Sequence, residues 1–242
     1  MTIYCITQAR MNSSRLPGKV LKTINGRPLI SLHLDRLSRA RSVDKVIVAS
    51  SNSSSNRNLI TYLEDGNVPY FEGSESDVLS RFYQTALAFG AQANDLIIRV
   101  TSDCPLICAD LINQLVSYYQ SSDCDYARID TNSYPRGFDA EIFTMQMLEE
   151  ANNQAKTDHQ REHVTPFFYQ QNSQYKTSAM VNTQGDESNF RLCVDEAEDF
   201  QLMSKLVEAF PSNYLKVQYR DIINYLEKHP ELTQINQHIQ QH

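Results

Sequence analysis

The chain has 242 residues, 41% of them hydrophobic, and a formal net charge of -7. This length can bury one sizeable core, so we expect one α/β domain over residues 1–242. The acidic balance argues against a nucleic-acid partner, because phosphate backbones favour a basic surface. No apolar run approaches the roughly 20 residues of a membrane-spanning helix, and the N-terminus lacks a signal-peptide pattern, so we expect a cytoplasmic protein with no membrane partner.

Three short apolar runs predict buried strands. They cover residues 3–6, 46–49 and 96–98 and have the continuous pattern of strands covered on both faces of a parallel sheet. In such sheets, ligands bind beyond the carboxyl ends of the strands. We therefore expect a site in the loops that begin near Thr7 and Thr101.

Helical patterns alternate with these strands. Apolar residues fall on one helical face over residues 30–37, and again over 79–89, where Asp77 offers an N-cap and Gly90 a stop. A third helix follows Asp110. The alternation of strand and helix predicts an open, right-handed, mostly parallel α/β sheet with helices on its faces.

The second half of the chain begins with a loop. Pro135 and Gly137 interrupt it, and alternation over residues 138–143 then predicts a strand that leaves the main sheet and walls a second substrate pocket. We interpret residues 132–181 as this small β excursion.

The rest of the chain has helical patterns. Residues 157–171 and 196–210 are expected to be helical, as is the tail from residue 218. Residues 234–242 are polar, rich in glutamine and terminal, so we expect them to fray.

The segment Gln8 to Lys19, QARMNSSRLPGK, follows the first predicted strand. It contains the cations Arg10, Arg15 and Lys19 and two serine hydroxyls, so its side chains and backbone N–H groups can wrap a triphosphate. Neither the GxGxxG nor the GxxxxGK[ST] pattern is present, which makes dinucleotide and P-loop sites poor alternatives. A solvated basic surface loop stays an alternative at this point.

This segment resembles the N-terminal signature of the sugar cytidylyltransferases, a group that includes CMP-KDO synthetases and acylneuraminate cytidylyltransferases. The nearest likeness is to the SpsF-type branch. Four further segments resemble that branch in the same order: RVTSDCPL at 99–106, YPRGFD at 134–139, REHVTP at 161–166 and VDEAED at 194–199.

The resemblance implies both a fold and an activity. The fold is the nucleotide-diphospho-sugar-transferase type, which is Rossmann-like. The activity is transfer of CMP from CTP to an acidic sugar, such as a nonulosonic or KDO-like acid, with release of pyrophosphate, for surface polysaccharide synthesis. Similar enzymes often pair through the excursion, so we expect a homodimer formed by residues 132–181.

The resemblance also implies a metal. Asp103 follows a predicted strand and Asp195 a later one, and similar enzymes hold Mg²⁺ between these two positions. On the residues alone, Asp195 could instead cap the next helix. The interpretation requires the two aspartates to lie together, near Lys19. The catalytic residues are then Arg10, Lys19, Asp103 and Asp195.

Further residues are assigned to the two substrates. The nucleotide site comprises Ala9, Arg10, Ser14, Arg15, Lys19, Ser76, Asp77, Arg81, Ser102 and Asp103, although helix capping explains Asp77 equally well. The sugar site comprises Arg136, Asp139, Glu141, Arg161, Glu162 and His163, in which arginine forks suit a carboxylate. Arg161 and Glu162 could instead pair on a helix surface.

Two other functions remain open at this point. The sequence Asp123-Cys124-Asp125 offers a DxD motif, which could hold the metal of a glycosyltransferase that uses a nucleotide sugar. It could equally begin the strand at residues 126–128. A non-catalytic nucleotide-binding protein on the same fold is the other alternative.

Overall fold

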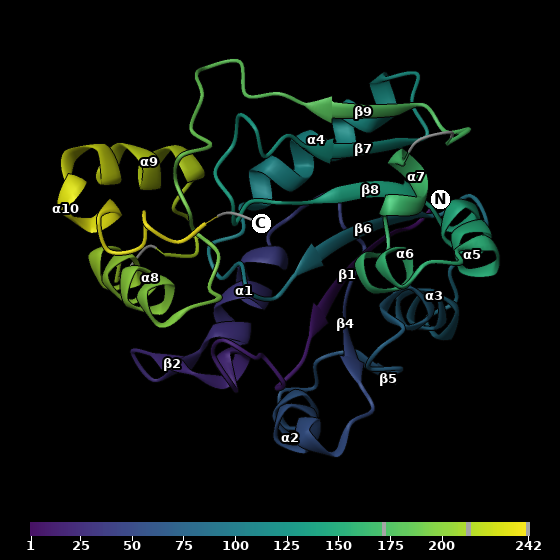
Figure 1. Ribbon diagram of the computed structural model, residues 1–242, viewed down its shortest axis with the longest axis horizontal. Coiled ribbons are helices and arrows are strands. Elements are labelled where there is room, and N and C mark those ends of the chain that lie inside the picture. Colours follow the sequence, from purple (N-terminus) through teal and green to yellow (C-terminus); the bar gives the residue numbers. More distant parts are fainter. Residues whose placement is uncertain (171–172, 212–213, 241–242) are drawn as a thin grey trace.

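The computed structural model describes residues 1–170, 173–211 and 214–240, and its core is a seven-stranded sheet (Figure 1). The strand order is β5-β4-β1-β6-β8-β7-β9. The bounds are β1 Ile3–Ala9, β4 Lys45–Ser51, β5 Tyr70–Gly73, β6 Leu96–Thr101, β7 Tyr126–Ile129, β8 Glu141–Thr144 and β9 Thr177–Met180. A separate hairpin pairs β2 Thr23–Ile24 with β3 Arg27–Pro28.

The helices are α1 Leu29–Leu37, α2 Arg57–Asp65, α3 Val78–Ala88, α4 Ala109–Ser121, α5 Met145–Gln154, α6 Asp158–His163, α7 Pro166–Tyr169, α8 Ala197–Ala209, α9 Tyr219–Lys228 and α10 Pro230–Thr233. Short 3-10 turns cover Lys19–Leu21 and Ser54–Asn56. Within the part of the chain that the structure describes, no helix has the length and apolar character to cross a bilayer.

The predicted parallel strands are confirmed. In β1, Cys5 lies opposite Val46 of β4 on one side and opposite Ile98 of β6 on the other, and both pairings are parallel. These central strands are covered on both faces, which explains their continuous apolar runs.

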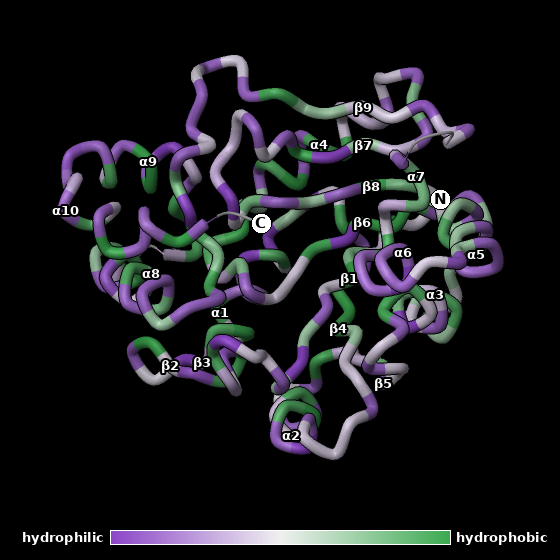
Figure 2. Tube along the Cα trace, in the orientation of Figure 1, coloured by the Kyte–Doolittle hydropathy of each residue, from purple (hydrophilic) through white to green (hydrophobic). Residues whose placement is uncertain are grey.

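Alternate residues of β1 enter two separate cores. Ile3 and Cys5 pack in the cluster formed with α1, α4, α8 and α9, whereas Tyr4 and Ile6 pack against α3, α5 and α7. Figure 2 shows apolar stretches along the central strands, while the short helix α6 is hydrophilic. The mostly parallel α/β sheet predicted from the sequence is therefore confirmed.

The prediction that residues 138–143 form a strand outside the main sheet is wrong. This strand is β8, which lies inside the sheet and runs antiparallel to both β6 and β7. Ile142 and Phe143 are completely buried, one in each core. Alternation toward two buried faces looks the same in the sequence as a separate excursion, because the pattern does not show which strands pair.

The helices of the second half differ from the prediction in two places. The predicted helix 196–210 is confirmed as α8, but 157–171 is divided into α6 and α7 by Val164, whose φ of 71° no helix continues through. Residue 171 lies outside the described residues, as do 241–242. The expectation that residues 234–242 fray is wrong at Asn236, which is 2% exposed.

The parallel strands end at one edge of the sheet. β1 and β6 are adjacent, with Gln8 opposite Thr101, so the loops that follow them start side by side. β7 also runs parallel to β6, because both are antiparallel to β8. Asp123 and Asp125 precede β7 and therefore lie at the opposite edge.

A close backbone contact joins the 135–137 turn to the segment before α8. The Leu192 N–H donates to the Arg136 carbonyl at 2.7 Å. Gly137 has a φ of 110°, and a Cβ there would lie 2.5 Å from the Leu192 carbonyl. Only glycine fits this position, because both the backbone conformation and the space exclude a side chain.

We expect Gly137→Ala to lower the free energy of unfolding by about 3 kcal/mol, from left-handed strain and overlap with the Leu192 backbone together. Gly26→Ala is the matched control, because Gly26 also has positive φ, 74°, but nothing lies within 4 Å of its Cβ position. That control should lose only about 1 kcal/mol. Urea unfolding measures both, and equal losses would mean that the overlap is relieved at no cost.

Candidate active site

A cavity of about 730 Å³ opens at the carboxyl edge of the sheet. Its walls come from the loop after β1, the segment before α3, the end of β6, α6 and the segment before α8. The predicted residues that line it are Ala9, Arg10, Ser14, Arg15, Lys19, Ser76, Asp77, Arg81, Ser102, Asp103, Arg136, Arg161, Glu162, His163 and Asp195.

Lys19 lines this cavity and contacts two carboxylates there. Its Nζ lies 3.3 Å from Oδ2 of Asp103 and 2.8 Å from Oδ1 of Asp195, and it donates to the Val194 carbonyl at 2.7 Å. The two aspartates thus lie together at the Lys19 loop, as the interpretation of the sequence required. One amine joins three segments that are far apart in the chain.

The charges of this cluster depend on one another. Burial alone would lower the pKa of Lys19, but the carboxylates of Asp103 and Asp195 outweigh it and raise the pKa above 10.5. For Asp103, burial opposes the charge, and Lys19 with the Thr101 hydroxyl still lowers the pKa below 3.8. Both groups are therefore charged at neutral pH.

Asp103 is fixed from several sides. The Thr101 hydroxyl donates to its Oδ1 at 2.5 Å, and the Val194 N–H donates to its backbone carbonyl at 2.7 Å. Behind it, the fully buried His33 bridges the Cys104 carbonyl and the Thr7 hydroxyl, each at 2.9 Å. Burial lowers the pKa of His33 to about 4, so this ring is neutral and holds the ends of β1 and β6 together.

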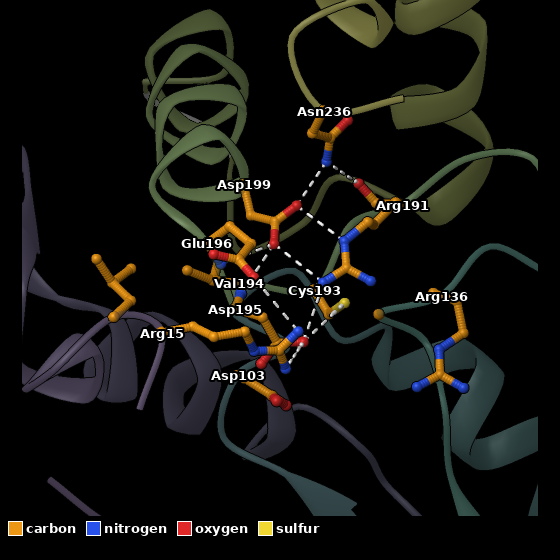
Figure 3. Close-up of polar contacts among 12 residues, drawn as sticks. Arg15, Asp103, Arg136, Arg191, Cys193, Val194, Asp195, Glu196, Asp199 and Asn236 are labelled. Carbon is orange, nitrogen blue, oxygen red and sulfur yellow. Dashed lines mark hydrogen bonds and ion pairs between the residues drawn. The ribbon is translucent and has the colours of Figure 1, made fainter. Parts of the chain in front are cut away.

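The carboxylate of Asp195 does not cap the next helix, so that alternative for the sequence is wrong. The N-cap of α8 is Glu196, in a capping box with Asp199. The Asp195 carboxylate instead faces the cations: its Oδ2 lies 3.3 Å from Arg15 and 3.0 Å from Arg191 (Figure 3). It is therefore available to a ligand in the cavity.

Comparison with known proteins bears on this geometry. A sequence model of the family described as "Cytidylyltransferase" matches residues 4–241. The chain belongs to the cytidylyltransferase family. The resemblance noted in the sequence is thus confirmed, and the protein is a nucleotidyltransferase.

Relatives of this cytidylyltransferase match along almost the whole chain. It is 34% identical to the uncharacterized protein MJ1063 of Methanocaldococcus jannaschii, over 100% of this chain and 97% of the relative. It is 26% identical to the spore coat polysaccharide biosynthesis protein SpsF of Bacillus subtilis, over 95% of each. A solved cytidylyltransferase structure from Leptospira borgpetersenii has a TM-score of 0.89 at 26% identity, covering 100% of this chain and 99% of that one.

One wall of the cavity contains a buried arginine, Arg81. Arg81 is 2% exposed, its Nη1 donates to the Ser74 carbonyl, and its Nε has no partner among the described residues. Burial first, and the nearby charge of Arg10 second, lower the pKa of Arg81 to about 10. An anion in the cavity would relieve this accumulation of positive charge.

Asp77 and Arg161 hold two walls of the cavity together. The Asp77 carboxylate caps α3 by accepting from the Ser80 N–H at 2.9 Å, and it pairs with Arg161 of α6. The remaining Arg161 nitrogen donates to the Asn152 carbonyl at 2.7 Å. Arg161 therefore pairs with Asp77 rather than with its neighbour Glu162.

Two predicted sugar-site residues do not line the cavity. Glu141 pairs with Arg99 and accepts from the hydroxyls of Tyr126 and Thr165, each at 2.6 Å. These partners use its carboxylate within the fold, so the assignment of Glu141 to the sugar site lacks support.

Asp139 lies behind Arg136. Its Oδ2 accepts from the Gly137 N–H at 2.8 Å, and its Oδ1 is 3.8 Å from Arg136 Nε. Burial raises the pKa of Asp139, although the charge of Arg136 opposes this. The geometry therefore places Arg136 in the cavity lining and Asp139 beneath it.

Arg191 lines the cavity and was missed in the sequence. Its side chain is 5% exposed and contacts both Asp195 and Asp199. A signal was present, because Arg191 is a cation only four residues before Asp195, with which it pairs. The family-like segment VDEAED begins only at Val194, so the resemblance does not include this arginine.

The Lys19 cluster predicts a pH-dependent stability. Because the pKa of Asp103 is lowered, its contribution is present above 3.8 and disappears as the pH falls; because the pKa of Lys19 is raised, its contribution is present below 10.5 and disappears above. We expect Lys19→Met to lower the unfolding free energy by about 2 kcal/mol at neutral pH. The loss should shrink below about pH 4, where protonated Asp103 no longer needs a cation.

Urea unfolding across this pH range, with a chelator present, measures the effect. Lys22→Met is a matched control, since Lys22 is exposed and lies three residues away in the same segment. A loss for Lys19→Met that stays constant from neutral to acidic pH would contradict the coupling.

Proposed function

We propose that this cytidylyltransferase transfers CMP from CTP to an acidic sugar, a nonulosonic or KDO-like acid, and releases pyrophosphate for polysaccharide synthesis. The observation that carries the proposal is the Lys19 amine between the carboxylates of Asp103 and Asp195, on the wall of a cavity lined by further arginines. Polysaccharide synthesis is suggested by the name of the relative SpsF.

The reaction must bring together two anions that repel each other. In the proposal, Arg10, Arg15 and Lys19 hold the triphosphate, with backbone N–H groups of the same loop. Arg15 is 42% exposed and reaches Asp195 only at 3.3 Å, so it can move to a phosphate without breaking a buried contact.

The donor set at Asp103 and Asp195 fits Mg²⁺. Hard carboxylate oxygens suit this ion, which usually takes one or two carboxylates and completes its shell with phosphate oxygens and water. Among the described residues no group of three acidic, His or Cys side chains is placed to hold a metal, so substrate oxygens would have to supply the remaining ligands. When bound, Mg²⁺ would neutralise charge on the α-phosphate.

The residues of the chain then orient the reaction. A hydroxyl oxygen of the sugar attacks the α-phosphorus and releases its proton to water, the bond from the α-phosphorus to the oxygen that bridges to the β-phosphate breaks, and pyrophosphate leaves. Lys19 and Arg10 would stabilise the charge on the departing oxygens, and positioning with charge neutralisation would supply most of the acceleration.

We propose that Arg136 binds the carboxylate of the sugar acid. Arg136 lines the same cavity as Lys19, and its side chain is 36% exposed. A guanidinium binds a carboxylate through two parallel hydrogen bonds. Glu162 and His163 of α6 line the same cavity and are proposed to contact sugar hydroxyls.

The structure does not support the alternative that the protein is a glycosyltransferase. Asp123 pairs with Lys176 at 2.7 Å with a side chain 93% exposed, and Asp125 accepts from the Lys176 N–H. Both precede β7 at the edge of the sheet opposite the cavity. Homodimerisation through residues 132–181 stays a prediction.

Asp103→Asn should lower the rate of CTP-dependent pyrophosphate release at least about a hundredfold, because one charge of the metal-binding pair is removed while the shape is kept. Asp123→Asn, the matched control, should leave the rate unchanged. The assay screens four nucleotides against a panel of sugar acids. The proposal would be rejected if Asp103→Asn turned over at the unaltered rate. It would also be rejected if none of the tested pairs of nucleotide and sugar acid released pyrophosphate.

Arg136→Met should raise the KM for the sugar acid about tenfold or more and leave the KM for CTP nearly unchanged, because only the sugar carboxylate loses its charged partner. Arg39→Met provides a control, since Arg39 is exposed and lies outside this cavity. A rise confined to the KM for CTP would place Arg136 in the nucleotide site instead, and equal rises in both KM values would contradict a selective contact with the sugar acid.

A further inference from the structure

A fully buried carboxylate lies behind the cavity wall. Asp199 has a side chain with no exposure, and both of its oxygens are occupied. Oδ2 accepts from the backbone N–H groups of Asp195 and Glu196, each at 3.0 Å, and from Arg191 at 3.0 Å. Oδ1 accepts from Arg191 Nε at 2.9 Å and from Asn236 at 2.8 Å.

These contacts hold Asp195 at two points. Its backbone N–H is bound to Asp199, and its carboxylate Oδ2 is bound to Arg191 at 3.0 Å. The same Arg191 nitrogen, Nη2, donates to both carboxylates. The direction in which Asp195 enters the cavity therefore depends on where Asp199 and Arg191 lie.

Asn236 closes this arrangement from the C-terminal tail. It lies beyond α10 in the C-terminal tail, and its side-chain amide is buried. The amide nitrogen donates to Asp199 Oδ1 at 2.8 Å and to the Arg191 backbone carbonyl at 3.0 Å. Figure 3 shows Asn236 above both residues, on the side away from Asp103. We call Arg191, Asp199 and Asn236 the C-terminal brace.

We propose that Asn236 is a positioning residue, which keeps Asp195 in register with Asp103 through the C-terminal brace. The inference rests on the proposed function, in which the two aspartates hold the metal ion. Asn236 does not line the cavity. Without its amide, Asp199 loses one donor and the Arg191 backbone loses its tie to the tail, so the guanidinium that aims Asp195 is free to shift.

The test measures metal binding without turnover. Mn²⁺ is titrated into the chain with CTP and, as a blank, into CTP alone, because the triphosphate itself binds the ion. Free Mn²⁺ is followed by its electron paramagnetic resonance signal, and the difference from the blank measures binding to the protein. We expect Asn236→Ala to weaken Mn²⁺ binding about tenfold, the usual effect of removing a partner of a metal ligand, and to lower kcat for pyrophosphate release by a similar factor. The KM for the sugar acid should stay unchanged.

Gln237→Ala is the matched control, because Gln237 is the exposed neighbour of Asn236 in the same tail. It should bind Mn²⁺ as the unaltered chain does. Asn236→Ser keeps a shorter donor and gives the same test, with a smaller effect, if the alanine variant does not fold. Thermal unfolding of each variant reports whether the fold is retained.

The outcomes separate the brace from the proposed function. Unaltered Mn²⁺ binding in folded Asn236→Ala or Asn236→Ser would reject the positioning role and leave the function standing. If the unaltered chain binds no Mn²⁺ with CTP, the metal role of Asp103 and Asp195 is rejected, and the brace with it. A tenfold loss confined to the Asn236 variants supports the inference.

Discussion

The site depends on one electrostatic requirement. The carboxylates of Asp103 and Asp195 approach the same point and would repel each other without a cation between them. Lys19 meets it, although it is separated from Asp103 by 84 positions and from Asp195 by 176. The sheet makes the meeting possible, because β1 and β6 are adjacent and end at the same edge. Arg15 adds a second, more exposed cation. The cluster is thus balanced before a substrate binds, and a triphosphate with a divalent cation could exchange partners with it at little cost in net charge.

Much of the frame could be predicted from the sequence, for local physical reasons. The strands at 3–6, 46–49 and 96–98 are buried on both faces, so each is a continuous apolar run. Asp77 was recognised as an N-cap because capping needs only the next three residues. The loop after β1 was predicted to bind phosphate because it has three cations within ten residues. In each case the signal and the structure lie in the same short segment.

The errors occurred where the outcome depends on residues far away in the chain. The strand at 138–143 joins the main sheet because β6 and β7 accept it on either side, which no local pattern shows. Glu141 looked like a sugar ligand, yet Arg99 and two hydroxyls use its carboxylate. The tail at Asn236 looked frayed, since polar terminal residues usually are. Its order comes from a carboxylate 37 positions earlier, and only the folded chain shows that contact.

Asp195 and Asp199 lie in one short segment, and their surroundings give them opposite roles. Asp199 is fully buried and its oxygens accept from backbone N–H groups, a guanidinium and an amide, so moving it would leave several buried donors unpaired. Asp195 keeps 20% exposure, and its oxygens contact cations whose charges a phosphate can share. A buried carboxylate with fixed donors is a poor ligand and a good anchor, whereas a partly exposed one held by cations can accept a metal. By holding Asp195 in one direction, Asp199 makes it suitable as a metal ligand, because a metal site tolerates little freedom in the direction of its carboxylates.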